Sequence, residues 1–432
     1  MKQEIIKLQR LITKDEEKIY LSIPVNVPKD VFEIEVRYKY ERWKRYSDDN
    51  GNFFEEEINI IDLSVIDPLN VCRGSSGSER SEFKINENSA TPGYLKGKIM
   101  QGNWNIILGA YKVEDSGCKV DIEVIYTFKE RVLMKGDLHN HSNNSDGKYT
   151  VDEVLMNAKL NGLDFICLTD HNTISQNNEL NNKYGIIAIP GMEWTHYKGH
   201  CNFIGVKEPI SNYVTNNIDG TIKVLEEASE NGAIIFLNHP FCNYCPWEWG
   251  FDVPFDGIEV WNGPMKESEM RAITWWHNML VKGEKIPIVG GSDSHKNELF
   301  RFTGSPSTCI YPKSKGISDI LEAIKNGNSF ITYTVNGPMI SMKAKDKIMG
   351  DIISENEFDT IKIEVENLKQ GDVIKVINQD GEYKVVEINK EKKKVILIDD
   401  KASDFYRVEI WRLLLGNELI LVSLTNPIYI SR

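Results

Sequence analysis

The sequence is poor in cysteine, in continuous apolar runs and in positive charge, and each shortage excludes a class of protein. Seven cysteines among 432 residues are too few for a disulfide framework, which a chain of this length does not need in order to fold. No run approaches the ~18 apolar residues of a membrane helix, and the charged start MKQEIIKLQRLITKDEEKIY lacks the apolar core of a signal peptide. We therefore expect a soluble protein of a reducing compartment, the cytoplasm.

Positive charge is outweighed, because 51 Lys and Arg face 64 Asp and Glu for a net charge of −13. A protein that binds DNA without regard to sequence, or an anionic lipid surface, needs clustered Lys and Arg. The balance disfavours nucleic acid and membrane as partners and leaves a small-molecule substrate. The sequence does not indicate an oligomeric state.

Three textures divide the chain and predict three domains, at 1–132, 133–334 and 335–432. The first carries alternating apolar runs such as FEIEVRYKY and KVDIEVIYTF between turn clusters, which is typical of a β-sandwich or jelly roll. The last has similar runs with Gly-containing turns and predicts an antiparallel β domain.

In the middle segment, short apolar strands alternate with helical stretches. Thr150 and Glu153 form a capping-box pattern ahead of apolar residues at helical spacing, and the buried-strand run FICLT follows. Repeated β-then-α units imply parallel strands joined by crossover helices, and hence an α/β barrel or a layered sheet.

All eight histidines lie in the middle segment, and most follow predicted strands. His139 and His141 are spaced to project from the same side of a strand, and the short loop SNNSDG returns Asp146 to them. Functional groups of α/β barrels sit where strands run out into loops. The candidate metal ligands are His139, His141, Asp146, His171, Glu193, His200, His239, Asp293 and His295.

Nine ligands are too many for one cation, so the sequence predicts two or three divalent metals. Nitrogen and carboxylate oxygen without thiolate suits Zn, Mn or Fe. Clustered cations of this kind activate water and stabilise a displaced oxyanion.

The motif series HxH…D, TDHN, GxEW, GHxNxxG, NHP and SDSH resembles the PHP (polymerase and histidinol phosphatase) metallohydrolase family. The β-rich flanks resemble its CehA/McbA branch. The resemblance implies a distorted (β/α)7 barrel, flanked by N-terminal and C-terminal β-sandwich-like domains, with a di- or trinuclear metal site.

The resemblance also implies a distribution of the ligands over three metals, with Glu193 as a bridge between the first two. The first metal takes His139, His141, Glu193 and Asp293, the second takes Glu193, His200 and His239, and the third takes Asp146, His171 and His295. Many relatives have His where Asp146 stands, and the added negative charge favours Mn or Fe over Zn there.

Other polar residues near these motifs are assigned by their type and position. Glu193, Asp170 and Arg301 are the candidate catalytic residues, and Asp170 would act through His171 or a metal-bound water. Arg301 is a candidate to bind a substrate anion through two parallel hydrogen bonds. We expect His196 to be a loop or pocket residue and His277 to lie on a helix face.

The favoured function is a metal-dependent phosphoesterase that uses a metal-bridging hydroxide, since clustered cations suit a multiply charged phosphoryl group. A carbamate, carboxyl ester or amide hydrolase on the same site is the alternative enzyme, and the aromatic loop FCNYCPWEWGF supports it. A non-catalytic binding protein with a retained metal site is the alternative of another class.

Overall fold

The computed structural model describes residues 2–48, 51–401, 403–414 and 418–431. The chain is a mixed α/β protein with many strands, and it forms two compact units. The first contains residues 1–131 and 313–317, and the second contains residues 132–312 and 318–432. The predicted division at residue 334 falls inside the second unit, and the three-domain division stays a prediction.

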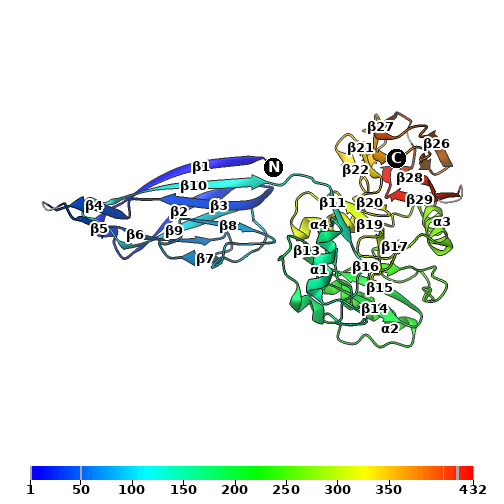
Figure 1. Ribbon diagram of the computed structural model, residues 1–432, viewed down its shortest axis with the longest axis horizontal. Coiled ribbons are helices and arrows are strands. Elements are labelled where there is room, and N and C mark those ends of the chain that lie inside the picture. Colours follow the sequence, from blue (N-terminus) through cyan, green and yellow to red (C-terminus); the bar gives the residue numbers. More distant parts are fainter. Residues whose placement is uncertain (1, 49–50, 402, 415–417, 432) are drawn as a thin grey trace. The chain divides into compact units, whose positions relative to one another are not determined.

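The first unit is built from two four-stranded antiparallel sheets (blue to cyan in Figure 1). In sheet order, these are β1 (Gln3–Ile12), β10 (Cys118–Phe128), β3 (Val31–Lys39) and β8 (Glu82–Asn86), then β2 (Tyr20–Val27), β9 (Gly102–Lys112), β6 (Ile60–Ile66) and β7 (Cys72–Ser76). Residues from both sheets share one hydrophobic core, in which Trp104 and Phe83 are fully buried. A separate hairpin joins β4 (Trp43–Ser47) and β5 (Phe53–Glu57).

Two sheets of the second unit each contain three neighbouring strands that run parallel. In one, β11 (Met134–Asp137), β12 (Phe165–Cys167) and β13 (Ile187–Ile189) run parallel. In the other, β16 (Ile234–Asn238), β17 (Gly257–Asn262) and β18 (Ile288–Gly291) run parallel. The strand predicted from FICLT corresponds to β12.

An antiparallel hairpin interrupts this pattern. β14 (Gly191–His196) turns through two residues into β15 (Gly199–Ile204), which pairs antiparallel with β16. A two-residue turn leaves no room for a crossover helix, so the paired strands must be antiparallel.

Two isolated parallel bridges connect the two sheets. The bridge from Asn140 to Ser294 connects the ends of β11 and β18, and the bridge from His171 to Glu193 links β12 to β14.

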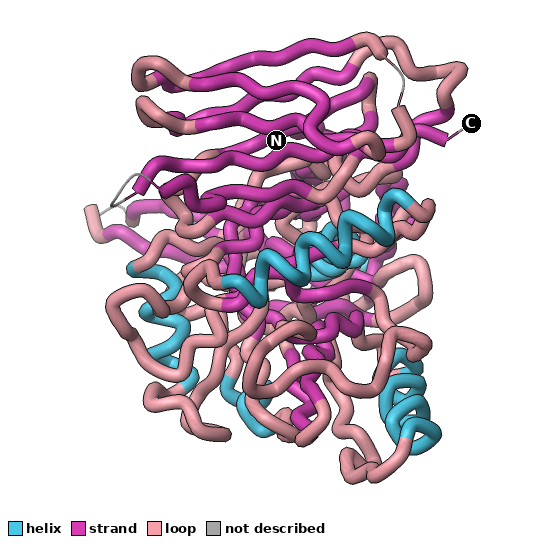
Figure 2. The backbone as a smooth tube through the Cα atoms, turned by 90° about the vertical axis from the view of Figure 1, so that its right-hand side faces the viewer, coloured by secondary structure: helices cyan, strands magenta, loops and turns pink. Residues whose placement is uncertain are grey.

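The helices of the second unit lie between residues 151 and 325. Figure 2 draws the helices in cyan. They are α1 (Val151–Leu160), α2 (Ile218–Glu230), α3 (Glu267–Val281) and α4 (Ile317–Lys325). The predicted capping box is confirmed: Thr150 Oγ1 accepts a hydrogen bond from the Glu153 backbone, and Glu153 accepts one from the Thr150 backbone. None of the described helices combines the length and apolar character that a membrane span needs.

The C-terminal strands extend the sheet that begins with β13, β12 and β11. The extension runs through β19 (Ser307–Ile310), β20 (Ser329–Thr332), β29 (Glu418–Thr425), β28 (Phe405–Leu414), β25 (Val373–Asn378) and β26 (Gly381–Glu387). The remaining strands are β21 (Met339–Ala344), β22 (Lys347–Ile348), β23 (Ile352–Ser354), β24 (Ile361–Leu368), β27 (Lys392–Asp399) and β30 (Ile428–Ser431). Phe405 and Leu424 pack in the same core as α2 and α3, so these strands belong to one unit with the histidine-rich segment.

Candidate metal centre

Several of the predicted ligands lie beyond the ends of strands of the second unit, whereas Glu193 and His200 lie within β14 and β15. His139 and His141 follow β11, His171 follows β12, His239 follows β16, and Asp293 follows β18. The two isolated bridges hold these ends together, because each joins a segment that carries a ligand to a neighbouring one. Residues distant in sequence are thereby brought to one place.

The β14–β15 hairpin explains why Glu193 and His200 meet. Glu193 pairs with Asn202 and Thr195 pairs with His200, so these four side chains project from the same face of the hairpin. Glu193 Oε1 lies 3.0 Å from His200 Nδ1. The Asn238 side chain, opposite His200 on β16, donates to the same oxygen at 2.8 Å.

The first cluster consists of His139, His141 and Asp293, with Glu193 beside them. Asp293 Oδ1 lies 3.5 Å from His139 Nε2 and 3.1 Å from His141 Nε2. Glu193 Oε2 lies 3.5 Å from each of these two nitrogens. Two ligands that share a cation at about 2.1 Å and a tetrahedral angle are about 3.4 Å apart, so these separations suit a shared metal ion.

The second cluster lies on the other oxygen of Glu193. His200 Nδ1 is 3.0 Å and His239 Nε2 is 3.9 Å from Glu193 Oε1. Cys245, which the sequence analysis did not place here, groups with the two histidines and lies 3.7 Å from His239 Nδ1. A thiol is thus within reach of a centre predicted to contain only nitrogen and oxygen.

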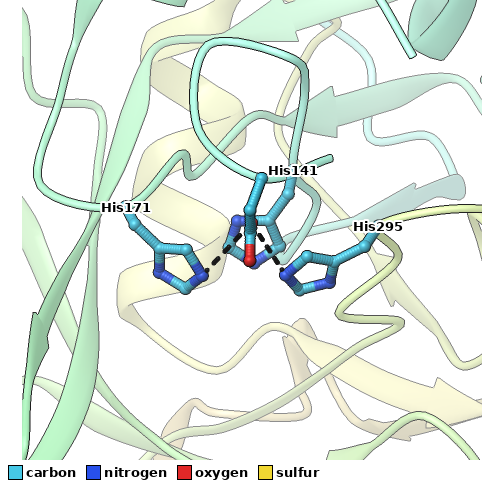
Figure 3. A group of neighbouring side chains, drawn as sticks. His141, His171 and His295 are labelled. Carbon is cyan, nitrogen blue, oxygen red and sulfur yellow. Dashed lines mark ion pairs between the residues drawn. The ribbon is translucent and has the colours of Figure 1, made fainter. Parts of the chain in front are cut away.

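The third cluster gathers His141, His171 and His295 around the carboxylate of Asp146 (Figure 3). Asp146 Oδ1 lies 3.1 Å from His295 Nε2 and 3.5 Å from His171 Nε2. His171 also approaches Glu193, with its Nδ1 2.8 Å from Oε2. The structure therefore brings all nine predicted ligands into three neighbouring clusters.

Charge inside the centre favours a bound cation. Burial alone would raise the pKa of Glu193, but His139, His171 and His200 outweigh it and hold that pKa well below its usual range. Burial would likewise lower the pKa of His139, but Glu259, Glu193 and Asp293 raise it well above its usual value. The carboxylates around His139 therefore favour a positive charge at this position. Without a metal a proton on His139 supplies that charge, and metal binding displaces such a proton.

The other buried histidines keep a free lone pair. Burial lowers the pKa of His239 to about 4 and also lowers the pKa of His141. A histidine must be neutral to bind a metal. Both rings are therefore in the ligand form at neutral pH.

Buried ring nitrogens without hydrogen-bond partners indicate whether these residues fit a metal ion. His139 and His141 are 0% and 1% exposed. Within the described part of the chain, His139 Nε2 and both ring nitrogens of His141 have no hydrogen-bond partner. Buried polar atoms without partners are costly unless another group satisfies them. Divalent metal ions bound by the clustered nitrogens and carboxylates would do so, and the residues present fit them.

Backbone strain gathers at the same place. His239, Asp293 and Asn172 have φ values of 31°, 51° and 51°, in the left-handed region that residues other than glycine rarely adopt. Asn172 is held by Thr195, whose backbone N–H donates to Asn172 Oδ1 at 2.9 Å. Such strain costs of order 1–3 kcal/mol per residue and persists where the surrounding structure holds it, which is typical of functional sites.

The two other predicted catalytic residues have contacts of their own. Asp170 is fully buried and accepts hydrogen bonds from Ser142 and Ser145, so it holds the loop that carries Asp146. Arg301 Nη1 lies 3.5 Å from Asp293 Oδ2. Its guanidinium lies against Gly263, where an added Cβ would approach Arg301 Nε to 2.9 Å.

Glu259 is a residue of the centre that the sequence analysis missed. Its carboxylate lies 3.0 Å from His139 Nδ1 and accepts from the backbone N–H of His239. A carboxylate on the far nitrogen of a ligand histidine fixes its ring orientation and tautomer. An acidic residue inside the buried run GIEVW was the available signal, because a buried Glu needs a partner.

The two remaining histidines lie outside the clusters. His196 Nε2 lies 3.0 Å from the Thr215 carbonyl oxygen, and its ring stacks on Trp194. His277 lies on α3, and its ring packs edge-on against the ring of Phe405, with 6.0 Å between the two ring centroids. Both positions agree with the pocket and helix-face interpretations.

Residues 137–274 match the family model of the PHP domain. The match includes the predicted ligands from His139 to His239, whereas Asp293 and His295 lie beyond it. An uncharacterised protein of Methanocaldococcus jannaschii is 28% identical over 145 residues, covering 30% of this chain and 82% of that protein.

Two solved structures are more distant. A two-domain protein from Bacteroides vulgatus, described as containing a predicted PHP-like metal-dependent phosphoesterase, shares 19% identity over 68% of this chain and 96% of its own, with a TM-score of 0.40. A lesion-specific endonuclease from Pyrococcus furiosus shares 19% identity over 45% of this chain and 56% of its own, with a TM-score of 0.33.

The family match and the clustered ligands agree on the same stretch of chain. Histidine and carboxylate clusters of this composition fit divalent metal binding and a metallohydrolase. Residues 137–274 of this chain are therefore a PHP domain.

Proposed function

We propose that this chain is a metal-dependent phosphoesterase with two or three divalent transition metals in its PHP domain. The observation that carries the proposal is the sharing of ligands between clusters. Glu193 offers one oxygen to the His139 and His141 side and the other to the His200 side, and His141 belongs to the first and third clusters. Shared ligands suit closely spaced cations, which stabilise both the attacking and the displaced oxygen of a phosphoryl group.

The proposed scaffold is a distorted (β/α)7 barrel with β-rich domains at 1–132 and 335–432. Its support is the run of pairings from β14 to β18, together with the two bridges that connect β18 to β11 and β12 to β14. These seven strands, β11, β12 and β14–β18, would form one closed ring. The CehA/McbA branch is part of this proposal and rests on the sequence resemblance.

The residues would divide the work as the clusters suggest. His139, His141, Glu193 and Asp293 would hold the first metal, Glu193, His200 and His239 the second, and Asp146, His171 and His295 the third. Bound metals supply an activated water at neutral pH and stabilise the charge of the displaced group. Zn, Mn and Fe all suit these ligands.

The chain's own side chains would orient this chemistry. Glu259 fixes the ring of His139, and Asn238 fixes the carboxylate of Glu193. Arg301 has a partly exposed guanidinium beside Asp293. A phosphoryl oxygen bound there would receive charge-assisted hydrogen bonds.

The second candidate is a carbamate, carboxyl ester or amide hydrolase at the same centre. A cleft without Lys or Arg among its described lining residues opens beside His200 and favours it. Such a cleft suits a substrate that carries little charge beyond the reacting group.

A parallel assay decides between these candidates. The full chain, loaded in turn with Mn, Zn or Fe(II), is given p-nitrophenyl phosphate and p-nitrophenyl acetate, with Glu193→Gln as the control. We expect metal-dependent release of nitrophenol from the phosphate that the variant loses. Hydrolysis of the acetate alone would establish the ester alternative. Bound metal without either activity would indicate the non-catalytic binding protein.

A further inference from the structure

A cleft of about 550 Å³ opens beside the second cluster. His200 and Cys245 line it on the side of the centre, and Thr195, whose hydroxyl lies 2.6 Å from His171 Nδ1, lines it as well. This volume falls within the range of pockets that bind small organic molecules. A substrate held by the metals therefore has space to place its remaining part here.

The lining of the cleft is rich in aromatic side chains. Among the described residues that line it, none is Asp, Glu, Lys or Arg. Tyr197, Tyr213 and Tyr244 supply rings, and Asn172 and Asn216 supply amides. A charged group of a ligand would have no oppositely charged Asp, Glu, Lys or Arg among these residues. A flat uncharged ring of a ligand could stack on the tyrosine rings.

One wall of the cleft is held rigidly. His196 Nδ1 accepts from the backbone N–H of Lys198 at 3.0 Å, and its Nε2 lies 3.0 Å from the Thr215 carbonyl oxygen. Because Nδ1 accepts a hydrogen bond, the ring donates to the Thr215 carbonyl oxygen through Nε2. Trp194 Nε1 donates to the Tyr213 carbonyl oxygen at 2.9 Å. The segment 213–215 is thereby tied to β14.

Two exposed tyrosines lie on segments that are tied to each other. Tyr197, in the β14–β15 turn, is fully exposed, and Tyr244, in the loop 241–251, is 96% exposed. The Glu248 backbone N–H donates to the Lys198 carbonyl oxygen at 2.8 Å, and an added Cβ on Gly199 would approach Trp247 Cε3 to 2.7 Å. The turn and the loop therefore fix the backbone from which both tyrosines line the cleft.

We propose that this cleft, lined by Tyr197 and Tyr244, binds an uncharged, ring-bearing leaving group of the substrate. The inference rests on the proposed hydrolase function and adds the substrate class. Stacking against one or both rings would select ring-bearing over short aliphatic substrates, and the uncharged lining would disfavour an anionic ring.

The test compares substrates that differ in the ring but leave alcohols of similar acidity. Phosphate release from benzyl phosphate, ethyl phosphate and 4-carboxybenzyl phosphate is measured with the metal-loaded full chain. The variants are the double substitution Tyr197→Ala with Tyr244→Ala, and the ring-preserving pair Tyr197→Phe with Tyr244→Phe. Tyr20→Ala, an 81% exposed tyrosine of the first unit, is the matched control.

We expect wild type to prefer benzyl over ethyl phosphate and to disfavour the carboxylated ring. The benzyl-to-ethyl ratio of kcat/KM should fall about tenfold in the double alanine variant, since two ring contacts are lost. It should stay within twofold in the phenylalanine pair and in Tyr20→Ala. A ratio near one in wild type, or a ratio unchanged in the double alanine variant, would overturn the inference while leaving the phosphoesterase intact.

Binding of inert analogues separates this inference from the proposed function. Benzylphosphonate and ethylphosphonate carry P–C bonds, and their affinity for the metal-loaded chain is measured by calorimetry. Suppose that no phosphate ester is hydrolysed, but that benzylphosphonate binds more tightly than ethylphosphonate and loses this advantage in the double alanine variant of Tyr197 and Tyr244. The cleft assignment then stands and the phosphoesterase proposal fails. Equal affinity for both analogues would overturn the cleft assignment.

Discussion

Glu193 contacts histidines of all three clusters, with His139, His171 and His200 within 3.5 Å of its carboxylate. Glu193 is 1% exposed, so its buried carboxylate needs positive charge nearby, from metal cations or from protonated histidines, to compensate its own negative charge. Its two oxygens face different clusters, with Oε2 toward His139 in the first and Oε1 toward His200 in the second.

Substitution of Glu193 by Gln should abolish most activity. The amide keeps the shape but removes the charge that would compensate two cations, and we expect a loss of at least two orders of magnitude in kcat/KM, roughly 3 kcal/mol. His277→Gln changes a histidine outside the clusters and should leave turnover close to wild type. Steady-state rates at matched metal content measure both. Equal losses in the two variants would contradict the ligand assignment.

Arg301 distinguishes the substrate classes at the scale of one side chain. Removing a charge-assisted contact costs about 1.5–3 kcal/mol, so Arg301→Ala should lower phosphate ester turnover by one to two decades and affect a neutral ester little. Arg301→Lys should recover only part, because a point charge lacks the fork geometry.

The readout for Arg301 is kcat/KM on p-nitrophenyl phosphate and p-nitrophenyl acetate for both variants. Proportional loss of both activities would mean that Arg301 supports the scaffold through Asp293, 3.5 Å away. Loss of neither would favour the ester hydrolase.

At the scale of the elements, the conformation of the loop 142–147 between β11 and α1 depends on Asp170, which follows β12. Asp170 accepts from the Ser142 backbone N–H at 2.8 Å and from the Ser142 and Ser145 hydroxyls at 2.7 and 2.6 Å. The loop carries Asp146, so the third cluster depends on Asp170 without a direct contact that the structure records.

Asp170→Ala should therefore weaken metal binding at the third cluster. It leaves buried donors of Ser142 unsatisfied, at a cost of about 1–3 kcal/mol each, and frees the loop. Elemental analysis should show up to one metal equivalent lost. Thr150→Ala is the control, because losing a helix cap costs a similar ~1 kcal/mol at the start of α1. Equal metal content in both variants would contradict the positioning role.

On the scale of the whole molecule, the two units have separate hydrophobic cores, and only the second holds the candidate metal centre. A metal that binds the folded state alone stabilises it, by about 2.7 kcal/mol per site at a free concentration of 100 Kd. The stability of the two units should therefore respond differently to metal removal.

Protein purified without chelator should contain at least two transition-metal equivalents per chain. In calorimetry, chelation should lower the Tm of the transition that belongs to the second unit and leave that of the first unit unchanged. Elemental analysis and scanning calorimetry before and after dialysis against EDTA measure both. Less than one metal equivalent, or an equal shift of both transitions, would contradict the assignment of the centre.

The ligand types were readable from the sequence because they depend on local order. A histidine pair such as His139 and His141 projects from one side of a short segment wherever that segment lies. The capping box of Thr150 and Glu153 depends only on residues three apart. The alternation of strands and helices likewise indicated a mixed α/β protein.

Contacts between distant segments were decided by the tertiary structure. Glu259 meets His139 across 120 residues, and Asp170 meets Ser142 across 28. The short turn that makes β14 and β15 antiparallel places Glu193 beside His200, and the loop 241–251 brings Cys245 to His239 and Tyr244 to the cleft. Sequence determined which side chains could bind a metal, because that is a property of each residue type. The path of the chain decided which carboxylates orient them and what kind of cleft they face, because those contacts exist only once the strands have paired.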